Sequence, residues 1–263
     1  MKGDITMKVL CIVQARMGSE RLPGKVIKPI LDKPMILYTL DRLNKSKYID
    51  EVILATSTEN KEEPLVNTVQ AAGYKVFRGD ENNVLKRYRD AADNFGGQII
   101  IRVTGDCPLI DPFIVDNVIS YFIIHNYDYA RLDVPDSSIR GFDVEVFSKE
   151  VLDRVYGTVC GNNEPSNNTN SEIDREQLNM YKEHVTLYMY RHQEQFNIGY
   201  VKGEAFYNKP YRLCVDTEED FNLVEKVYTY FNNEFVSGKD VIKYLDENAE
   251  VSQINMEIKQ KNV

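Results

Sequence analysis

The segment QARMGSERLPGK, residues 14–25, places three basic side chains and two glycines in one short stretch. It follows KVLCIV, an apolar run that predicts a buried strand. The guanidinium groups of Arg16 and Arg21 can form paired hydrogen bonds with phosphate oxygens, and the ammonium of Lys25 adds a compact positive charge. A P-loop or dinucleotide site is not indicated, because the segment lacks both GK[ST] and GxGxxG. Composition alone leaves two interpretations, an anion-binding loop and a solvated basic loop.

Two aspartates follow other strand-like runs. Asp106 comes after QIIIRVTG, and Asp216 comes after RLCV. Ligands of open parallel sheets bind at the carboxyl ends of the strands, so these carboxylates can share a site with the basic loop. Two such carboxylates can also share Mg²⁺, which prefers oxygen ligands and keeps water and substrate phosphates in its shell. Each has a structural alternative, Asp106 as a turn residue and Asp216 as part of a helix cap before Thr217.

Three further polar residues are candidates for binding a second substrate. Asp143 and Glu145 in GFDVEVF lie two apart on a predicted strand, so their side chains point to the same face. They could bind sugar hydroxyls if that face lines a pocket, and they are ordinary polar residues if it faces solvent. His184 lies on a predicted helix, where packing is the alternative to a binding role.

The elements that must position these residues alternate along the first half of the chain. Apolar, β-branched runs are separated by segments with helical spacing of apolar residues, which predicts a mostly parallel sheet covered by helices on both faces. We therefore expect an α/β fold with three layers. The expected strands are 8–13, 51–57, 75–79 and 98–106, and the expected helices are 35–45, 61–72, 83–95 and 112–124.

The second half predicts a mixed sheet. Strands are expected at 127–133, 141–148, 196–202 and 212–216, and helices at 177–193 and 217–231, the last with Thr217 as its N-cap. The Asn-rich segment 157–174 has few apolar side chains and predicts a polar surface loop with the composition of a disordered segment. Without an internal repeat or a long linker, residues 1–263 are expected to form a single domain.

Composition narrows the classes of function. Hydrophobic residues make up 43% of the chain, its net charge is −9, and its pI is near 5.0, which argues against a general nucleic-acid binder. The four cysteines form no CxxC pair and no zinc spacing, so reduced, buried thiols are expected. The apolar run 9–13 is too short for a signal peptide, and no run approaches a membrane span. These features favour a cytoplasmic protein.

The motifs together resemble the cytidylyltransferase family that contains the CMP-sugar synthetases, and in particular its SpsF-like spore-coat polysaccharide branch. Nearly the whole chain takes part, and the first and fourth motifs in combination are specific. Two departures are Lys182, where this branch often has Arg, and the long, polar segment 157–174. The motifs are IVQARMGSERLPGKVIKP, DEVILATST, VFRGDENNVLKRY, RVTGDCPLIDP, RGFDVEVF, KEHVTLYMYRH and RLCVDTEEDF.

The resemblance implies a nucleotidyltransferase fold, Rossmann-like and three-layered, with a mixed, mainly parallel sheet. It implies that the first loop holds the triphosphate of an NTP, and that Asp106 and Asp216 bind Mg²⁺ and act in catalysis with Arg16 and Lys25. Asp143, Glu145 and His184 would belong to the acceptor side. The implied nucleotide-binding positions are Gln14, Ala15, Arg16, Met17, Gly18, Ser19, Arg21, Lys25, Thr56, Ser57, Arg78, Gly79, Asp80, Asn83 and Thr104.

The expected reaction is attack of an acceptor oxygen on the α-phosphorus of an NTP, with release of pyrophosphate. The resemblance favours CTP, a phosphorylated or acidic sugar-type acceptor, a role in polysaccharide synthesis, and a homodimer. Three alternatives remain open: a guanylyltransferase of the same fold, a nucleotide-sugar-dependent glycosyltransferase, and a non-catalytic nucleotide-binding module. A glycosyltransferase is less well supported, because no DxD motif follows the strand that ends near Asp106.

Overall fold

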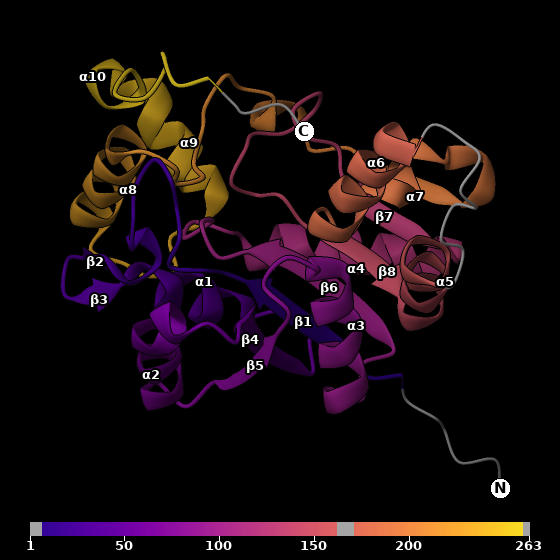
Figure 1. Ribbon diagram of the computed structural model, residues 1–263. Helices are drawn as coiled ribbons and strands as arrows, with labels where there is room; N and C mark the ends of the chain where they lie inside the picture. The colour runs from indigo at the N-terminus through magenta and orange to yellow at the C-terminus, as the bar shows by residue number, and fades with distance from the viewer. Residues whose placement is uncertain (1–6, 162–170, 260–263) are drawn as a thin grey trace, which may run out of the picture.

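The computed structural model describes residues 7–161 and 171–259 and arranges them around a seven-stranded sheet (Figure 1). The strand order is β5-β4-β1-β6-β8-β7-β9. β8 runs antiparallel to both neighbours, and the other pairs of this sheet are parallel, so the expected mixed, mainly parallel sheet is confirmed. The strands are β1 (Val9–Gln14), β4 (Glu51–Ser57), β5 (Lys75–Gly79), β6 (Ile99–Thr104), β7 (Tyr129–Leu132), β8 (Glu145–Ser148) and β9 (Ile198–Val201).

Helices cover both faces of the sheet because its central strands are apolar on both sides. Alternate residues of a strand point to opposite faces. Cys11 and Val13 of β1 enter a core shared with α1, α4 and α8, whereas Leu10 and Ile12 enter a second core shared with α3 and α5. The helices are α1 (Met35–Leu43), α2 (Glu63–Ala71), α3 (Val84–Phe95), α4 (Pro112–His125), α5 (Lys149–Cys160), α6 (Ser171–Glu183), α7 (Leu187–Arg191), α8 (Glu218–Phe231), α9 (Gly238–Glu247) and α10 (Ala249–Ser252).

The C-terminal helices lie far from the helices that follow β8. Figure 1 shows α8, α9 and α10 gathered near the small hairpin of β2 (Pro29–Ile30) and β3 (Lys33–Pro34), with α5, α6 and α7 at the other end of the molecule. Within the described part of the chain, no helix is both long and apolar enough to cross a membrane.

The order of the strands creates a crevice between β1 and β6. After β1 the chain adds β4 and β5 on one side, and it then returns to place β6 on the other side of β1. Gln14 at the end of β1 is in register with Thr104 at the end of β6. Loops that leave neighbouring parallel strands in opposite directions open the crevice in which ligands of such sheets bind.

A glycine keeps these two loops close together. Gly105 donates its backbone N–H to the carbonyl of Gln14 at 2.8 Å. A Cβ at this position would lie 2.7 Å from the Cβ of Ala15, so a larger residue would force the loops after β1 and β6 apart. The end of β6 therefore presents Asp106 beside the first loop.

The structure differs from the expected elements in its second half. The segment 157–174 is not a loop at either end, because α5 continues to Cys160 and α6 begins at Ser171. The reason at the first end is packing, since Val155 and Val159 are spaced one helical turn apart and both are buried. Residues 162–170 of that prediction lie outside the described residues.

The expected helix 177–193 is interrupted, and two expected strands are shorter or missing. α6 ends at Glu183 and α7 begins at Leu187, so His184 lies in a turn instead of a helix. β8 begins only at Glu145, which leaves Asp143 before the strand. Segment 212–216 forms no named strand in the described structure and contributes a single bridge between Arg140 and Arg212. α8 with its Thr217 cap is confirmed.

Candidate active site

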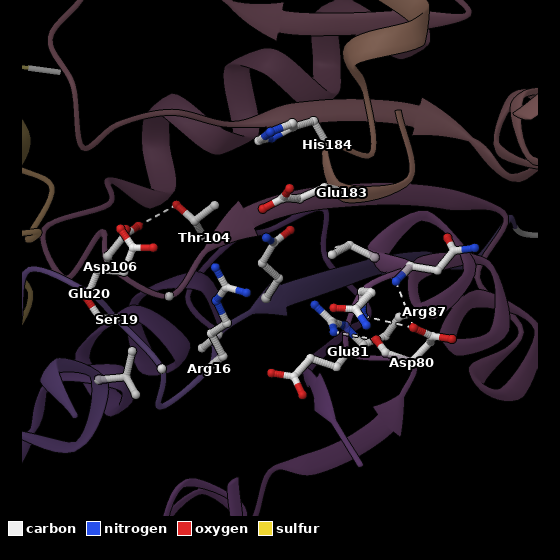
Figure 2. Close-up of a pocket in the computed structure, with 18 of the residues that line it drawn as sticks. Arg16, Ser19, Glu20, Asp80, Glu81, Arg87, Thr104, Asp106, Glu183 and His184 are labelled. Carbon is white, nitrogen blue, oxygen red and sulfur yellow. Dashed lines mark hydrogen bonds between the residues drawn. The ribbon is translucent and has the colours of Figure 1, made fainter. Parts of the chain in front are cut away.

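A pocket of about 970 Å³ opens at the carboxyl ends of β1 and β6 (Figure 2). This volume lies within the range of small-molecule sites. The first loop forms one part of the pocket, the segment after β5 forms another, and residues of α6 lie across from them. The expected site residues that line it are Gln14, Ala15, Arg16, Gly18, Ser19, Arg21, Lys25, Asp80, Asn83, Thr104, Asp106, His184 and Asp216.

A buried carboxylate supports the first loop from below. Glu62 has no exposed surface, and its Oε2 accepts the backbone N–H of Met17 at 2.9 Å and the hydroxyl of Thr56 at 3.0 Å. Gly24 adopts a positive φ of 71°, which turns the chain into the short helical turn that begins with Lys25. Met17 and Thr56, both expected in the nucleotide site, are thus tied to this support and are absent from the pocket lining.

Lys25 connects the two aspartates. Its Nζ lies 3.1 Å from Oδ2 of Asp106 and 2.8 Å from Oδ1 of Asp216, and it also donates to the backbone carbonyl of Val215 at 2.6 Å. Burial disfavours the charged form of Lys25, but the attraction of both carboxylates outweighs this effect and raises its pKa. The fold therefore unites the basic loop and both strand-end carboxylates in one charged cluster.

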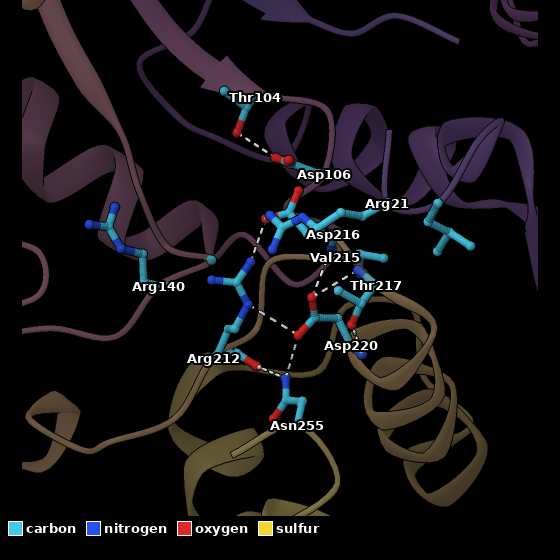
Figure 3. A network of polar contacts seen from close by, with 12 residues as sticks. Arg21, Thr104, Asp106, Arg140, Arg212, Val215, Asp216, Thr217, Asp220 and Asn255 are labelled. Carbon is cyan, nitrogen blue, oxygen red and sulfur yellow. Dashed lines mark hydrogen bonds and ion pairs between the residues drawn. The ribbon is translucent and has the colours of Figure 1, made fainter. Parts of the chain in front are cut away.

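The negative charge of Asp216 is balanced by more positively charged side chains than that of Asp106 (Figure 3). Besides Lys25, it pairs with Arg21 at 2.7 Å and with Arg212. Burial opposes ionisation of Asp216, yet Lys25, Arg21 and Arg212 together lower its pKa. Asp106 has a different partner, since its Oδ1 accepts the hydroxyl of Thr104 at 2.6 Å.

The helix-cap interpretation of Asp216 is wrong, because other residues cap α8. Thr217 and Asp220 form a capping box. Oδ2 of Asp220 accepts the backbone N–H groups of Asp216 and Thr217 at 2.9 and 3.0 Å, while its Oδ1 binds Arg212 and Asn255. Figure 3 shows these residues below Asp216. They fix the backbone of Asp216 and leave its carboxylate at the pocket.

Asp106 and Asp216 are the carboxylates of this cluster that could hold a metal ion. Among residues 7–161 and 171–259, no group of three or more His, Cys, Asp or Glu side chains is arranged to hold a metal. Two carboxylates fit Mg²⁺ if water and substrate phosphates complete its shell. The ammonium of Lys25 lies between the two carboxylates, so a metal held by both requires Lys25 to move.

The segment after β5 lines the pocket, but the side chain of Arg78 does not. Oδ1 of Asp80 accepts the backbone N–H groups of Asn82 and Asn83, and these bonds lower the pKa of Asp80. Asn83 caps α3. Arg78 instead pairs with Glu63 and donates to the backbone carbonyls of Ser57 and Glu59. Ser57 and Gly79 are likewise absent from the lining.

Of the three residues expected to bind the acceptor, one lines the pocket and two do not. His184 lines the pocket, and Figure 2 shows it with Glu183 across from Arg16. Burial lowers the pKa of His184, with a smaller opposing effect from Glu183. Asp143 binds Arg140 and the backbone N–H of Gly141. Neither Asp143 nor Glu145 is among the lining residues. The two side chains therefore do not face this pocket together, which was one of the two interpretations of their spacing.

Glu145 belongs to a network of its own. It pairs with Arg102 of β6, accepts the hydroxyl of Tyr129, and accepts the hydroxyl of Thr186 at 2.8 Å. Burial alone would raise the pKa of Glu145, but Arg102 and the hydroxyl donors lower it. Because Thr186 follows the turn at His184, this network ties the end of α6 to the sheet.

Sequence reasoning missed several residues that line the pocket. The clearest is Arg87, whose position gave a usable signal: it lies on the apolar face of α3, three residues after Val84 and four before Ala91. A charge on a buried helix face needs a partner or a ligand. The other missed residues are Glu20, Val26, Glu81, Asn82, Val84, Gly105, Asn179, Lys182 and Glu183.

The fold and pocket have counterparts among known proteins. The structure superposes with a TM-score of 0.82 on a cytidylyltransferase from Leptospira borgpetersenii, which is 30% identical, with 98% of this chain and 100% of that chain covered. The architecture is that of the nucleotidyltransferases. A family model described as Cytidylyltransferase matches residues 10–255, and the chain belongs to this family.

Two further relatives confirm the resemblance stated from the motifs. The spore coat polysaccharide biosynthesis protein SpsF of Bacillus subtilis is 29% identical over 254 residues, which cover 93% of this chain and 96% of that protein. A CMP:2-keto-3-deoxy-manno-octonic acid synthetase, solved as a complex with CTP, has a TM-score of 0.59 at 20% identity and covers 85% of this chain and 99% of that one. At 20% identity, the likeness to this synthetase shows a shared fold and no more.

Proposed function

We propose that this protein transfers CMP from CTP to a phosphorylated or acidic sugar-type acceptor and releases pyrophosphate, with Mg²⁺ as cofactor. The observation that carries the proposal is the contact of Lys25 with both Asp106 and Asp216 in a pocket lined by Arg16 and Arg21. Membership of the cytidylyltransferase family supports the transfer of a cytidylyl group. The SpsF relative supports a product used in surface or spore-coat polysaccharide synthesis.

The cations of the first loop have a direct role in this proposal. In the structure, Arg21 and Lys25 pair with carboxylates that also face the pocket. When CTP enters, phosphate oxygens replace the carboxylates as partners of these two side chains. Arg16, which is exposed on the same loop, adds a third positive charge. These groups neutralise the pyrophosphate as the bond between the α-phosphorus and the bridging oxygen breaks.

Once Lys25 has turned to the phosphates, Asp106 and Asp216 would be the carboxylates that hold Mg²⁺, while Arg212 stays paired with Asp216. Bound there, the ion supplies positive charge to the phosphate oxygens at the reacting centre. Thr104 keeps its hydrogen bond to Asp106, and Asp220 holds the backbone of Asp216, so both carboxylates stay in place during the exchange.

The acceptor is expected to contact the end of α6. Asn179, Lys182, Glu183 and His184 line that side of the pocket. Asn179 and Glu183 can bind hydroxyls, and Lys182 suits an anionic group. Burial lowers the pKa of His184, which favours its neutral form over a positive charge beside the acceptor. An acceptor that arrives as an anion needs no general base before its oxygen attacks the α-phosphorus.

The test measures pyrophosphate release with each of the four NTPs against sugar phosphates, small phosphomonoesters and nonulosonic acids, with and without Mg²⁺. We expect release with CTP and one class of acceptor only, and no release when Mg²⁺ is removed. Asp106→Asn is the negative control for contaminating activity. Release of a nucleoside diphosphate from a nucleotide sugar would instead indicate a glycosyltransferase, and turnover with GTP alone would contradict the choice of base.

A further inference from the structure

Arg87 is a buried cation whose hydrogen bonds are incomplete. Its residue is 4% exposed, and its Nη1 donates to the backbone carbonyl of Asp80 at 2.8 Å. Its Nε is buried and has no hydrogen-bond partner among the described residues. No carboxylate in that part of the chain forms an ion pair with Arg87. A buried donor without an acceptor is destabilising, which makes such a group a candidate for ligand binding.

The side chain of Arg87 is buried and lines the pocket. It packs over Gly79, where an added Cβ would lie 3.0 Å from the Cγ of Arg87. Burial lowers the pKa of Arg87, and the charge of Arg16 adds to this effect, although an arginine remains protonated at neutral pH. Gly79 was expected from sequence to contact the nucleotide. Because it has no side chain, it instead provides the space in which Arg87 packs.

Its place in the pocket favours a nucleoside over a phosphate group. Figure 2 shows Arg87 with Asp80 and Glu81 at the side of the pocket away from Ser19 and Asp106. A polyanion suits the basic first loop better than a wall that carries two carboxylates. A neutral base, with a hydrogen-bonding edge and a flat face that can rest on Val84, fits this end.

A second buried group supports the same assignment. Oε1 of Gln14 is buried without a partner, and Gln14 lines this pocket too. An amide can offer either an acceptor or a donor, so Gln14 alone does not separate cytosine from uracil. Arg87 can do so, because it offers only donors. Cytosine presents adjacent acceptors at O2 and N3 and a donor at N4, whereas N3 of uracil carries a hydrogen.

We propose that Arg87 selects the nucleobase by donating to O2 and N3 of cytosine. The inference rests on the proposed function, because it assigns the nucleoside end of the same NTP site. Arg78, a nucleotide-binding position implied by the resemblance, pairs with Glu63, is not among the lining residues and takes no part in this contact. Arg87 is then a specificity-determining residue, and the phosphate contacts stay with the first loop.

The test compares the binding of CTP and UTP to the intact protein by calorimetry, for the wild type, Arg87→Met, Arg87→Lys and Arg78→Met. Arg78→Met is the matched control, since it removes an arginine near the same strand that lies outside the pocket. We expect Arg87→Met to weaken CTP about 10- to 100-fold and UTP much less, so that the preference disappears. Arg87→Lys keeps the charge but loses the planar fork, and it should weaken CTP about tenfold. Arg78→Met should leave the ratio unchanged.

The outcomes separate this inference from the proposed function. Equal weakening of CTP and UTP by Arg87→Met would assign Arg87 to phosphate or to the fold and overturn the inference. An unchanged CTP-to-UTP ratio in both Arg87 variants would do the same, while the nucleotidyltransferase proposal would stand. A wild-type protein that binds no NTP would instead contradict the proposed function. Thermal unfolding of each variant identifies a loss of fold. If Arg87→Met does not fold, the CTP-to-UTP ratio of Arg87→Lys decides whether Arg87 selects the base.

Discussion

Two ion-pair clusters lie at β6, one just beyond its carboxyl end and one that includes Arg102 within the strand, and they differ in what surrounds them. The cluster of Lys25, Asp106 and Asp216 lines the pocket, whereas the cluster of Arg102 and Glu145 does not. Thr104 and Arg102 lie two residues apart on β6, so their side chains share one face of the sheet. One strand thus positions both clusters, and only one of them can exchange its partners with a ligand.

The difference shows how similar side chains come to have different roles. Glu145 binds Tyr129 and Thr186, whose residues are 0% and 3% exposed, so nothing can replace its partners without unfolding the region. The carboxylates of Asp106 and Asp216 keep 24% and 19% of their side-chain surface exposed. We therefore expect substitutions in the pocket cluster to affect turnover, and substitutions in the Glu145 cluster to affect stability.

The largest effect is expected for Asp106→Asn. The amide keeps the size of the side chain and its bond to Thr104, but it removes the negative charge. Under the proposed function, turnover should fall about 10³-fold, as for loss of a group that stabilises charge in the transition state. The readout is pyrophosphate release, with the melting temperature as a check on folding. Asp246→Asn, which alters a carboxylate that pairs with Lys209 outside the pocket, is the control. Retained turnover in Asp106→Asn would contradict the catalytic assignment.

Lys25→Met should lower turnover about 10²-fold and change metal binding in the opposite direction. Lys25 occupies the position between the two carboxylates, so its removal leaves their negative charge less compensated. We expect Mn²⁺ to bind the nucleotide-free variant at least about tenfold more tightly than the wild type, measured by electron paramagnetic resonance.

Lys28→Met is the matched control for this experiment. Lys28 lies on the same segment, but it pairs with Glu218 and does not line the pocket. Its loss should change neither turnover nor metal binding. If Lys25→Met leaves Mn²⁺ affinity at the wild-type level, competition between Lys25 and a metal for the two aspartates is ruled out.

Glu145→Gln tests the other side of the comparison. It removes the charge that compensates Arg102, and we expect the free energy of unfolding to fall by about 2 kcal/mol. For a chain of this size, that corresponds to about 4–8 °C in melting temperature. The control is Glu63→Gln, since Glu63 is half exposed and surface pairs contribute little. A greater loss of turnover than of stability would place Glu145 in the chemistry after all.

The smallest effect concerns the pH dependence of stability. The pKa of Glu145 is lowered from its usual value of 4.5, despite burial, by Arg102 and the hydroxyl donors. The unfolded chain therefore binds this proton more readily than the folded protein. The stabilisation is complete above about pH 4.5 and is lost as the pH falls through the lowered pKa. Urea midpoints from pH 7 to pH 3 should fall less steeply for Glu145→Gln than for the wild type, and parallel curves would contradict this.

Much of the fold could be predicted because its signals are local. Continuous apolar runs predicted the central strands, and the residues that begin α8 predicted its cap. The errors occur where packing overrides composition. α5 extends to Cys160 because Val159 is buried, and the helix expected around His184 is broken where Thr186 binds Glu145.

Part of the candidate site could also be predicted, because its signals are local in the sequence. The residue types and the strand ends indicated the first loop, Asp106 and Asp216, and the structure brings them together. The helical spacing marks Arg87 as a residue of a buried face, but it does not show which of Arg78 and Arg87 lines the pocket. Only the direction of each side chain separates them, and that depends on Glu63 at the surface and on the space over Gly79.

The sequence by itself determined the class of fold and the chemical groups available to the site, since hydrophobic patterns and strand ends are properties of neighbouring residues. The tertiary structure decided which charges meet. Lys25 and Asp216 are separated by 191 positions and lie 2.8 Å apart, because β1, β6 and the segment before α8 converge at one edge of the sheet. The same convergence leaves Glu145 outside the pocket and places the buried Lys25 in its lining, so it assigns one carboxylate to stability and two to the pocket.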